Sequence, residues 1–387
     1  MSSRLQSAVG LVAFLVIAWV LSEDRRKLPL RAILWGLALQ FLLATFILHT
    51  AVGQIGFNGF QSLVERFVGF SGEGARLLFG PLGDNRLLAE KFGPANGMIF
   101  AITITSIIIF VSTVSALLYH WGILQKVVRA AAWVMRKAMR TSGSETLSAA
   151  ANIFMGQTEA PLLVRPYLAR MTRSELFAIM VGGMATIAAS VLGAYVSFGI
   201  SAGHLLTASV LSAPAGLLVA KIMLPESEVS DTAAGASAKV ERQSVNSLDA
   251  ACRGASEGMQ LSLNVAAMLI AFVSLVALVN WVVSAGLGKL GFRHDQPLQL
   301  FLGWINAPMA WLMGIPMKDC RTIGAILGER IVLNEFLAYL SLTKVKAGLD
   351  ERSVILTTYA LCGFANLGSI AIQIGGIGSM APNRRTD

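Results

Sequence analysis

Long apolar stretches alternate with short polar or charged stretches along most of the chain. Seven of the apolar stretches hold about 20 residues each, enough for a helix rising about 1.5 Å per residue to cross a hydrocarbon core about 30 Å thick. We therefore predict seven transmembrane helices, at Leu5–Leu21, Leu28–His49, Gly97–Tyr119, Leu176–Ile200, Leu205–Leu224, Gly258–Val283 and Val354–Ile374.

A further apolar region between the third and fourth spans is broken by polar and helix-breaking residues. Its two arms, Leu147–Met155 and Pro161–Leu168, are each too short to cross a bilayer. Both arms adjoin stretches that we place in the cytoplasm, so the region enters and leaves the membrane on one side. It is therefore predicted to be a re-entrant helical hairpin.

A second such region, Leu298–Leu342, is interrupted at residues 306–308, 314–316 and 328–330. Non-helical backbone is tolerated at membrane depth only where protein buries it or where it lines a wet cavity. We therefore expect the tips of both hairpins to lie in a site. The spans that follow the hairpins carry polar or small-residue interruptions too, at residues 182–186 and 363–369.

The basic residues of the short loops set the predicted orientation, because Lys and Arg collect on the cytoplasmic side. The loop after the first span carries Arg25, Arg26, Lys27 and Arg31, which places that loop in the cytoplasm and the N-terminus outside. Alternation of the spans then makes the second hairpin enter from the outer face. Paired interruptions from opposite faces indicate an inverted repeat with a substrate site near the midplane.

The stretch from Leu224 to Asp249 is rich in Ser, Ala, Glu and Asp and has no apolar period, which is typical of a flexible linker. The predicted organisation has five parts: 1–140, scaffold spans with an interfacial helix; 141–224, the first transport repeat; 225–257, a cytoplasmic linker; 258–285, a sixth scaffold span; and 286–387, the second transport repeat.

The amino-acid composition agrees with a membrane protein whose apolar surface contacts the lipid bilayer. Hydrophobic residues make up 55% of the 387 residues and charged residues only 14%, and the mean hydropathy is +0.65. The net charge of +9 does not indicate a nucleic-acid partner, because the basic residues lie in short runs between apolar stretches. The three cysteines and four histidines are too scattered for a zinc site.

The interrupted regions hold the candidate chemistry. Glu159 and Glu335 are carboxylates at predicted membrane depth, where an ionised group is costly and therefore indicates function. The alternative is a structural ion pair with Arg165, Arg321 or Arg330. The neighbouring amides and hydroxyls suit an uncharged, hydroxyl-rich solute better than an anion; they belong to Asn152, Gln157, Thr158, Asn334 and Asn366.

Three segments, in this order, resemble the signature segments of the concentrative nucleoside transporter family. They are Gly156-Gln157-Thr158-Glu159-Ala160-Pro161, Asn334-Glu335-Phe336, and Cys362-Gly363-Phe364-Ala365-Asn366-Leu367-Gly368-Ser369-Ile370 followed by Gly375-Gly376-Ile377-Gly378. The resemblance covers essentially the whole chain. It implies a multi-pass homotrimer of the bacterial inner membrane, in which the hairpins and broken helices form a transport domain beside a scaffold.

The resemblance also assigns roles to residues of the site. Gln157, Thr158 and Glu159 would contact the nucleobase, with Val191 and Phe364 beside it. The ribose hydroxyls would bind Glu335, Asn366 and Ser369. The sodium ion, the implied cofactor, would bind Asn152, Thr186 and the backbone carbonyls of Met155 and Ile187.

Two positions depart from the family pattern. Thr186 stands where serine is expected, which keeps the hydroxyl ligand and adds a methyl group. The chain also ends after Pro382 with five more residues, where the family continues into an eighth span. We therefore expect the second repeat to be one helix short.

The function predicted from these features is sodium:nucleoside symport, importing nucleosides such as uridine. Because all the proposed ligands lie on the hairpins and broken spans, we expect that unit to move as an elevator past a fixed scaffold. A proton-coupled transporter is the closest alternative, since Glu159 or Glu335 could carry a proton. A hydrolase is disfavoured because the sequence lacks G-x-S-x-G and H-E-x-x-H. A channel is disfavoured because no repeated filter motif occurs.

Overall fold

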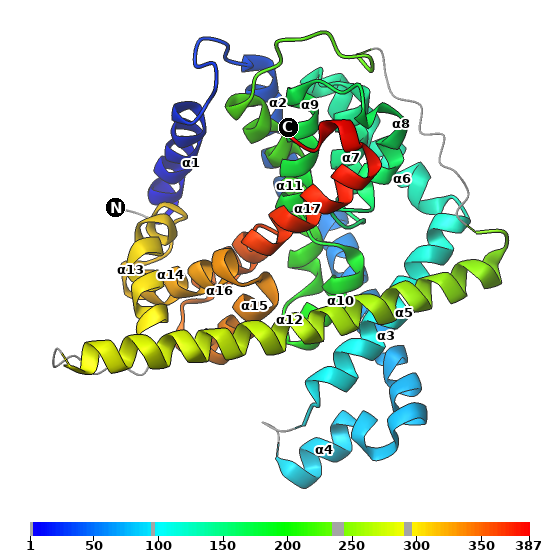
Figure 1. The fold of residues 1–387 in the computed structure, drawn as a ribbon, viewed down its shortest axis with the longest axis vertical. Coiled ribbons are helices and arrows are strands. Elements are labelled where there is room, and N and C mark those ends of the chain that lie inside the picture. Colours follow the sequence, from blue (N-terminus) through cyan, green and yellow to red (C-terminus); the bar gives the residue numbers. More distant parts are fainter. Residues whose placement is uncertain (1–2, 94–96, 234–243, 290–295) are drawn as a thin grey trace.

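The computed structural model describes residues 3–93, 97–233, 244–289 and 296–387, and all the regular elements in those ranges are helices (Figure 1). The α-helices are α1 Ser3–Val20, α2 Leu30–His49, α3 Ala51–Phe79, α4 Asn85–Phe92, α5 Phe100–His120, α6 Ile123–Met139, α7 Gly143–Ala151, α8 Arg165–Leu168, α9 Arg173–Ala185, α10 Ala189–Ser197, α11 Ala202–Met223, α12 Ser247–Lys289, α13 Pro297–Leu312, α14 Met317–Val332, α15 Glu335–Val345, α16 Glu351–Leu361 and α17 Leu367–Met380. The described ranges also contain four short 3-10 helices, at Gly80–Gly83, Ala160–Val164, Lys346–Gly348 and Pro382–Arg384.

The predicted class, an all-helical membrane protein, is confirmed. Within the described ranges, five helical stretches are long and apolar enough to cross a membrane: α2, α5, the broken pair α9–α10, α11 and most of α12. The first and seventh predicted spans correspond to shorter apolar helices, α1 and, after a break, α17. The stretch between the second and third predicted spans contains α3 and α4.

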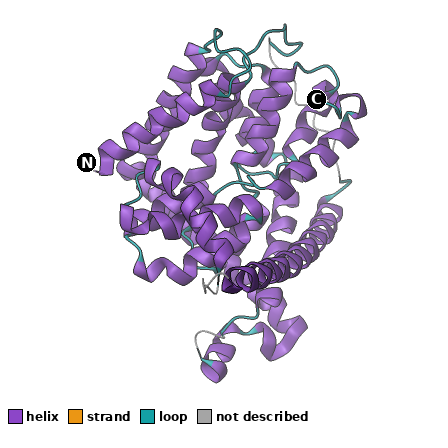
Figure 2. Ribbon diagram, turned by 60° about the vertical axis from the view of Figure 1, so that its left-hand side comes forward, coloured by secondary structure: helices purple, strands orange, loops and turns teal. Residues whose placement is uncertain are grey.

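Helix α12 is 43 residues long and lies across the other helices, packed along α5 (Figures 1 and 2). It begins at Ser247, inside the range 225–257 that we predicted as linker, so that the predicted sixth span continues a longer helix. Residues 234–243 of that range lie outside the described residues. Only 6% of the most apolar 18-residue stretch of α12 is buried within the chain, so the apolar side chains of α12 face outward.

The first hairpin has the predicted shape. Helix α7 ends at Ala151, the chain turns over residues 152–159, and a 3-10 turn followed by α8 leads back. Both ends of the hairpin meet the same short segment. The Gly143 amide donates to the Thr232 carbonyl at 2.9 Å, and Arg170 pairs with Asp231 at 3.6 Å.

The second hairpin differs from the prediction in where its helices break. Helices α13 and α14 meet at an angle of 118° across residues 313–316, and α14 and α15 meet at residues 333–334. The predicted interruptions at 306–308 and 328–330 are wrong, because both lie inside helices. Gly328 instead allows close packing, since a Cβ there would lie 2.6 Å from the Leu302 Cβ. Gly314, with φ of 95°, supplies the actual turn.

The two hairpins enter the fold from opposite ends. The start of α9 meets the end of α11, where Ser174 donates to the Leu224 carbonyl at 2.6 Å, and the base of the first hairpin lies at this end. Gly199, in the turn between α10 and α11, marks the other end. A Cβ on Gly199 would lie 3.3 Å from the Lys346 Nζ, which belongs to the base of the second hairpin. This is the arrangement that an inverted repeat requires.

Candidate functional site

The tips of the hairpins meet where the fourth and seventh spans are broken. The fourth span is broken between α9 and α10, and the seventh between α16 and α17. A hydrogen bond joins the breaks directly, from the Phe364 amide to the Thr186 carbonyl at 3.2 Å. The first hairpin joins them through the Phe154 carbonyl, which accepts from the Ala189 amide at 3.2 Å. Backbone groups of these three segments are therefore hydrogen-bonded to one another in one region.

Glu335 begins α15, directly after the capping residue Asn334, whose side chain accepts from the Leu337 amide at 3.0 Å. Its carboxylate is 3% exposed and accepts two hydrogen bonds from neutral groups. The donors are the Tyr195 hydroxyl at 3.0 Å and the Asn366 Nδ2 at 3.1 Å. The second hairpin, α10 and the seventh span thus converge on one carboxylate.

Neither Glu159 nor Glu335 forms a direct ion pair with any residue in the described ranges. Arg330 nevertheless lies close enough to Glu335 for the two charges to interact. Arg330 donates to the Gly363 carbonyl at 3.4 Å, and Arg321 lies 4.2 Å from the centre of the Trp304 ring.

The first hairpin brings its polar residues to the start of α17. Gln157 is buried, and its Nε2 donates to the Ser369 hydroxyl at 3.2 Å. Thr158 packs through its methyl group against Gly376 of α17, where an added Cβ would lie 3.1 Å from the Thr158 Cγ2. The Glu159 carboxylate accepts from the Gly156 amide at 3.2 Å and is otherwise exposed.

The two residues predicted to lie beside the nucleobase are on α10 and in the break of the seventh span. Val191 is buried on α10, and Phe364 is half-buried within the break of the seventh span.

The four residues predicted to bind sodium lie around the break of the fourth span. Asn152 caps the end of α7 and is fully buried, and neither polar atom of its side chain has a hydrogen-bond partner in the described chain. The Thr186 hydroxyl donates to the Gly182 carbonyl at 3.2 Å, which leaves its lone pairs free. Met155 and Ile187 are buried beside them. A buried amide oxygen without a partner, among hydroxyl and carbonyl oxygens, suits a hard cation.

A cavity of ≈ 640 Å³ opens beside the tip of the first hairpin. Glu159, Met155 and Ser190 line one wall, and the C-terminal half of α5, the start of α6 and the first turns of α12 line the other. The residues of that opposite wall include Ser112, Ser115, Tyr119, Gln125, Arg129, Arg253 and Glu257. The C-terminal end of α5 is followed by α6, whose Arg129 lines the cavity together with Arg253 of α12.

Sequence reasoning missed Tyr195, which lies in an apolar stretch of α10. The residue is completely buried, and its ring packs against Phe336 and Tyr339 with centroid separations of 4.9 and 4.6 Å. A buried tyrosine hydroxyl needs a partner, and this one finds Glu335. The only sequence signal was a tyrosine within a predicted span, which by itself indicates packing.

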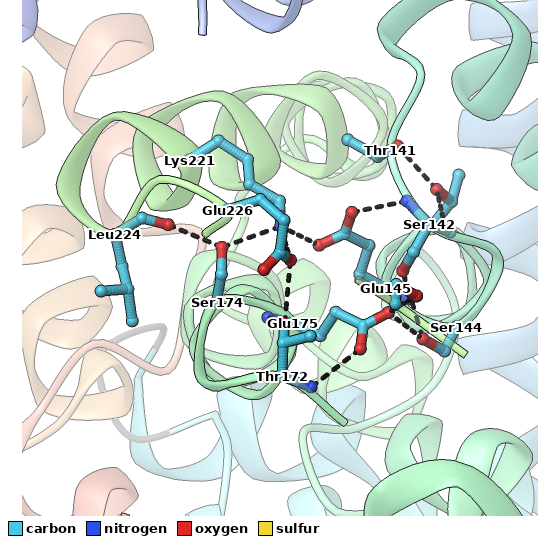
Figure 3. Close-up of polar contacts among 12 residues, drawn as sticks. Thr141, Ser142, Ser144, Glu145, Thr172, Ser174, Glu175, Lys221, Leu224 and Glu226 are labelled. Carbon is cyan, nitrogen blue, oxygen red and sulfur yellow. Dashed lines mark hydrogen bonds and ion pairs between the residues drawn. The ribbon is translucent and has the colours of Figure 1, made fainter. Parts of the chain in front are cut away.

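A second missed feature is a buried polar cluster at the base of the first hairpin, which we call the base cluster (Figure 3). Lys221 of α11 pairs with Glu145 of α7 at 2.6 Å, and the two side chains are 7% and 1% exposed. Glu145 also closes a capping box with Ser142, and Glu175 closes a matching one with Thr172.

The segment 226–232, which follows α11, covers the base cluster. Glu226 accepts from the Thr172 hydroxyl at 2.8 Å, and Thr232 donates to the Glu175 carboxylate at 3.2 Å. The first residues of the predicted linker are therefore attached to the first repeat.

The fold and this site together define a membrane transporter built from an inverted repeat, and comparison with known proteins gives its family. Three family models match: Na+ dependent nucleoside transporter N-terminus over residues 9–82, Nucleoside recognition over 101–202, and Na+ dependent nucleoside transporter C-terminus over 204–387. An uncharacterized transporter of Haemophilus influenzae is 42% identical over 100% of this chain and 92% of its own length.

The sodium/nucleoside cotransporter 1 of Rattus norvegicus is 41% identical over 99% of this chain, and the chain spans 60% of that longer protein. Among solved structures, CNTnw in an inward-facing substrate-bound state matches with a TM-score of 0.93 and 38% identity, over 99% of this chain and 91% of that one. A variant of CNTnw in an outward-facing state matches with a TM-score of 0.92. The chain belongs to the Na+-dependent concentrative nucleoside transporter family.

Proposed function

We propose that this protein is a sodium:nucleoside symporter that imports nucleosides such as uridine. The observation that carries the proposal is the Glu335 carboxylate at the tip of the second hairpin, buried where α10 and the seventh span converge and hydrogen-bonded by two neutral donors. A carboxylate with spare lone pairs can accept hydrogen bonds from two adjacent hydroxyl groups, which a ribose offers.

In this proposal the two hairpins bind opposite ends of the nucleoside. Glu335, Asn366 and Ser369 hold the ribose. Gln157, Thr158 and Glu159, with Val191 and Phe364, hold the base. The hydrogen bond from Gln157 to Ser369 supports this proposal, because it joins a residue of the base group to a residue of the ribose group and so places both groups in one site.

Sodium is favoured over a proton as the coupling ion. Asn152 is the supporting observation, because its buried amide lacks any partner in the described chain and cannot carry a proton at neutral pH. The proposed ligands are Asn152 and Thr186 with the carbonyls of Met155 and Ile187, a set of hard oxygens. The proton-coupled alternative would rely on the carboxylate of Glu159, which lines the cavity, or on that of Glu335.

The proposed cycle is an elevator. The first hairpin, α9, α10, the second hairpin, α16 and α17 carry the ligands, while α2, α5 and α12 form the wall. The outward-facing apolar side chains of α12 support its contact with lipid or with other subunits in a homotrimer. We place the protein in a bacterial inner membrane with the N-terminus outside, which makes the cavity beside Glu159 open to the cytoplasm.

Equilibrium binding of uridine to the purified protein tests the proposal. Titration calorimetry in sodium and in choline should show tighter binding in sodium and little dependence on pH. Asn152→Ala and Thr186→Val should weaken sodium binding, and uridine binding at sub-saturating sodium should weaken with it. Reciprocal linkage requires that sodium and uridine change each other's affinity by the same factor. Uridine binding that follows pH and ignores sodium would favour the proton-coupled alternative.

A further inference from the structure

The C-terminal end of α9 contacts residues of both proposed ligand groups. The Thr186 hydroxyl donates to the Gly182 carbonyl, and a Cβ on Gly182 would lie 3.3 Å from the Asn152 Nδ2. One residue further along, a Cβ on Gly183 would lie 3.0 Å from the Gln157 Cβ. The proposed sodium ligands and the proposed nucleobase ligand therefore pack against neighbouring residues of one helix.

A single side chain connects this end of α9 to the helix that carries the ribose ligands. Gln373 lies on α17, one helical turn after Ser369, and its Nε2 donates to the Met180 carbonyl at 3.0 Å. Gly183 leaves room for it, because a Cβ there would lie 2.5 Å from the Gln373 Nε2. The bond from Gln157 to Ser369 lies one turn away on the same helix.

Burial of the Gln373 amide is energetically unfavourable, so packing alone does not explain why a glutamine occupies this position. The side chain is 0% exposed, and its Oε1 has no hydrogen-bond partner in the described part of the chain. An unpaired acceptor in a buried place is unfavourable, and an apolar side chain of the same length would avoid that penalty. The bond that Gln373 donates to α9 is the feature that an apolar side chain would lose.

We propose that Gln373 is a positioning residue that couples sodium binding to nucleoside binding; this inference rests on the proposed function. Sodium bound by Asn152 and Thr186 holds the end of α9 in one conformation. The bond to Met180 transmits that constraint to α17, which then presents Ser369 to the nucleoside. Gln373 itself contacts neither ligand in this scheme. It acts through the two helices that it joins.

The test measures the coupling factor, defined as the ratio of uridine dissociation constants without and with saturating sodium. In Gln373→Met this factor should fall by about 3–10-fold, the worth of one neutral hydrogen bond. The uridine affinity measured without sodium should change by a smaller factor than the coupling factor does. The matched control is Gln6→Met, because buried Gln6 also donates to carbonyls of another segment, Trp311 and Ile315, far along the chain from the proposed ligands. Gln6→Met should lower the melting temperature and leave the coupling factor unchanged.

Gln373→Leu replaces Gln373→Met if the latter does not fold. A folded variant whose coupling factor equals that of the wild type overturns the inference. An equal loss of uridine affinity with and without sodium also overturns it, since that pattern belongs to a binding or packing residue. A wild-type protein without sodium dependence would overturn the proposed function and this inference together, whereas an unaltered coupling factor in the variant overturns this inference alone.

Discussion

At the tip of the second hairpin, Glu335 joins a tyrosine of the first repeat to an asparagine of the second. If its carboxylate holds the ribose, Glu335→Gln should weaken uridine binding by about 10–100-fold, because hydrogen bonds to a charged acceptor contribute about 1.5–3 kcal/mol each. Calorimetry in saturating sodium measures the change. Glu351→Gln, at an exposed position of the adjoining helix, is the control and should bind normally. Binding by Glu335→Gln within a few-fold of wild type would exclude the ribose role.

The residues of the hairpin tips could be predicted because polar side chains stand out within apolar sequence. Gln157, Glu335 and Asn366 are of this kind, and their division between ribose and base came from the family resemblance. Tyr195 and Gln373 could not be singled out. Each stands alone in an apolar stretch, where helical spacing indicates packing, and only the folded breaks bring them to Glu335 and Met180.

Among the helices, the base cluster ties α7 to α11 through a buried ion pair (Figure 3). Lys221→Met should destabilise the protein by about 3–5 kcal/mol, because it leaves the Glu145 charge buried without its partner. Thermal unfolding in detergent measures this effect, and adding Glu145→Gln should recover part of the loss. Lys318→Met, which breaks the exposed pair with Asp350, should change stability little. Equal effects of the two lysine substitutions would show that the buried pair has no special role.

The positions of the helix breaks were predicted less accurately than the positions of the helices themselves. Apolar length identifies the spans, because lipid imposes a minimum on any helix that crosses it. Glycine and proline identify breaks poorly. Pro308 lies inside α13, and Gly328 serves close packing between α13 and α14 rather than a turn. Inside a membrane protein, a neighbouring helix can satisfy the backbone groups that such residues free, so composition alone does not decide the outcome.

Across the molecule, the elevator mechanism predicts that the transport unit changes its depth along α5. Gly193 of α10 now packs against Ile107, since a Cβ on Gly193 would lie 2.7 Å from the Ile107 Cγ2. After replacement of the three native cysteines, Gly193→Cys should cross-link with Ile107→Cys in this state. In the opposite state it should cross-link with Phe100→Cys, about 10 Å further along the helix.

The control for this experiment lies within the wall. A Cβ on Gly258 of α12 would lie 2.7 Å from the Ile109 Cα, so Gly258→Cys and Ile109→Cys should cross-link in every state. The ratio of the two Gly193 cross-links should change with sodium and uridine. If the pairing with Phe100→Cys never forms, the transport unit does not move past α5.

The proposed sodium site, nucleoside site and elevator motion would together produce sodium-driven accumulation of nucleoside. Uptake of labelled uridine into proteoliposomes, with sodium and pH gradients imposed separately, measures it directly. An inward sodium gradient alone should concentrate uridine above its external level, and a sodium ionophore should abolish the accumulation. A pH gradient alone should give only background uptake. Accumulation driven by the pH gradient without sodium, or no accumulation in either gradient, would contradict sodium:nucleoside symport.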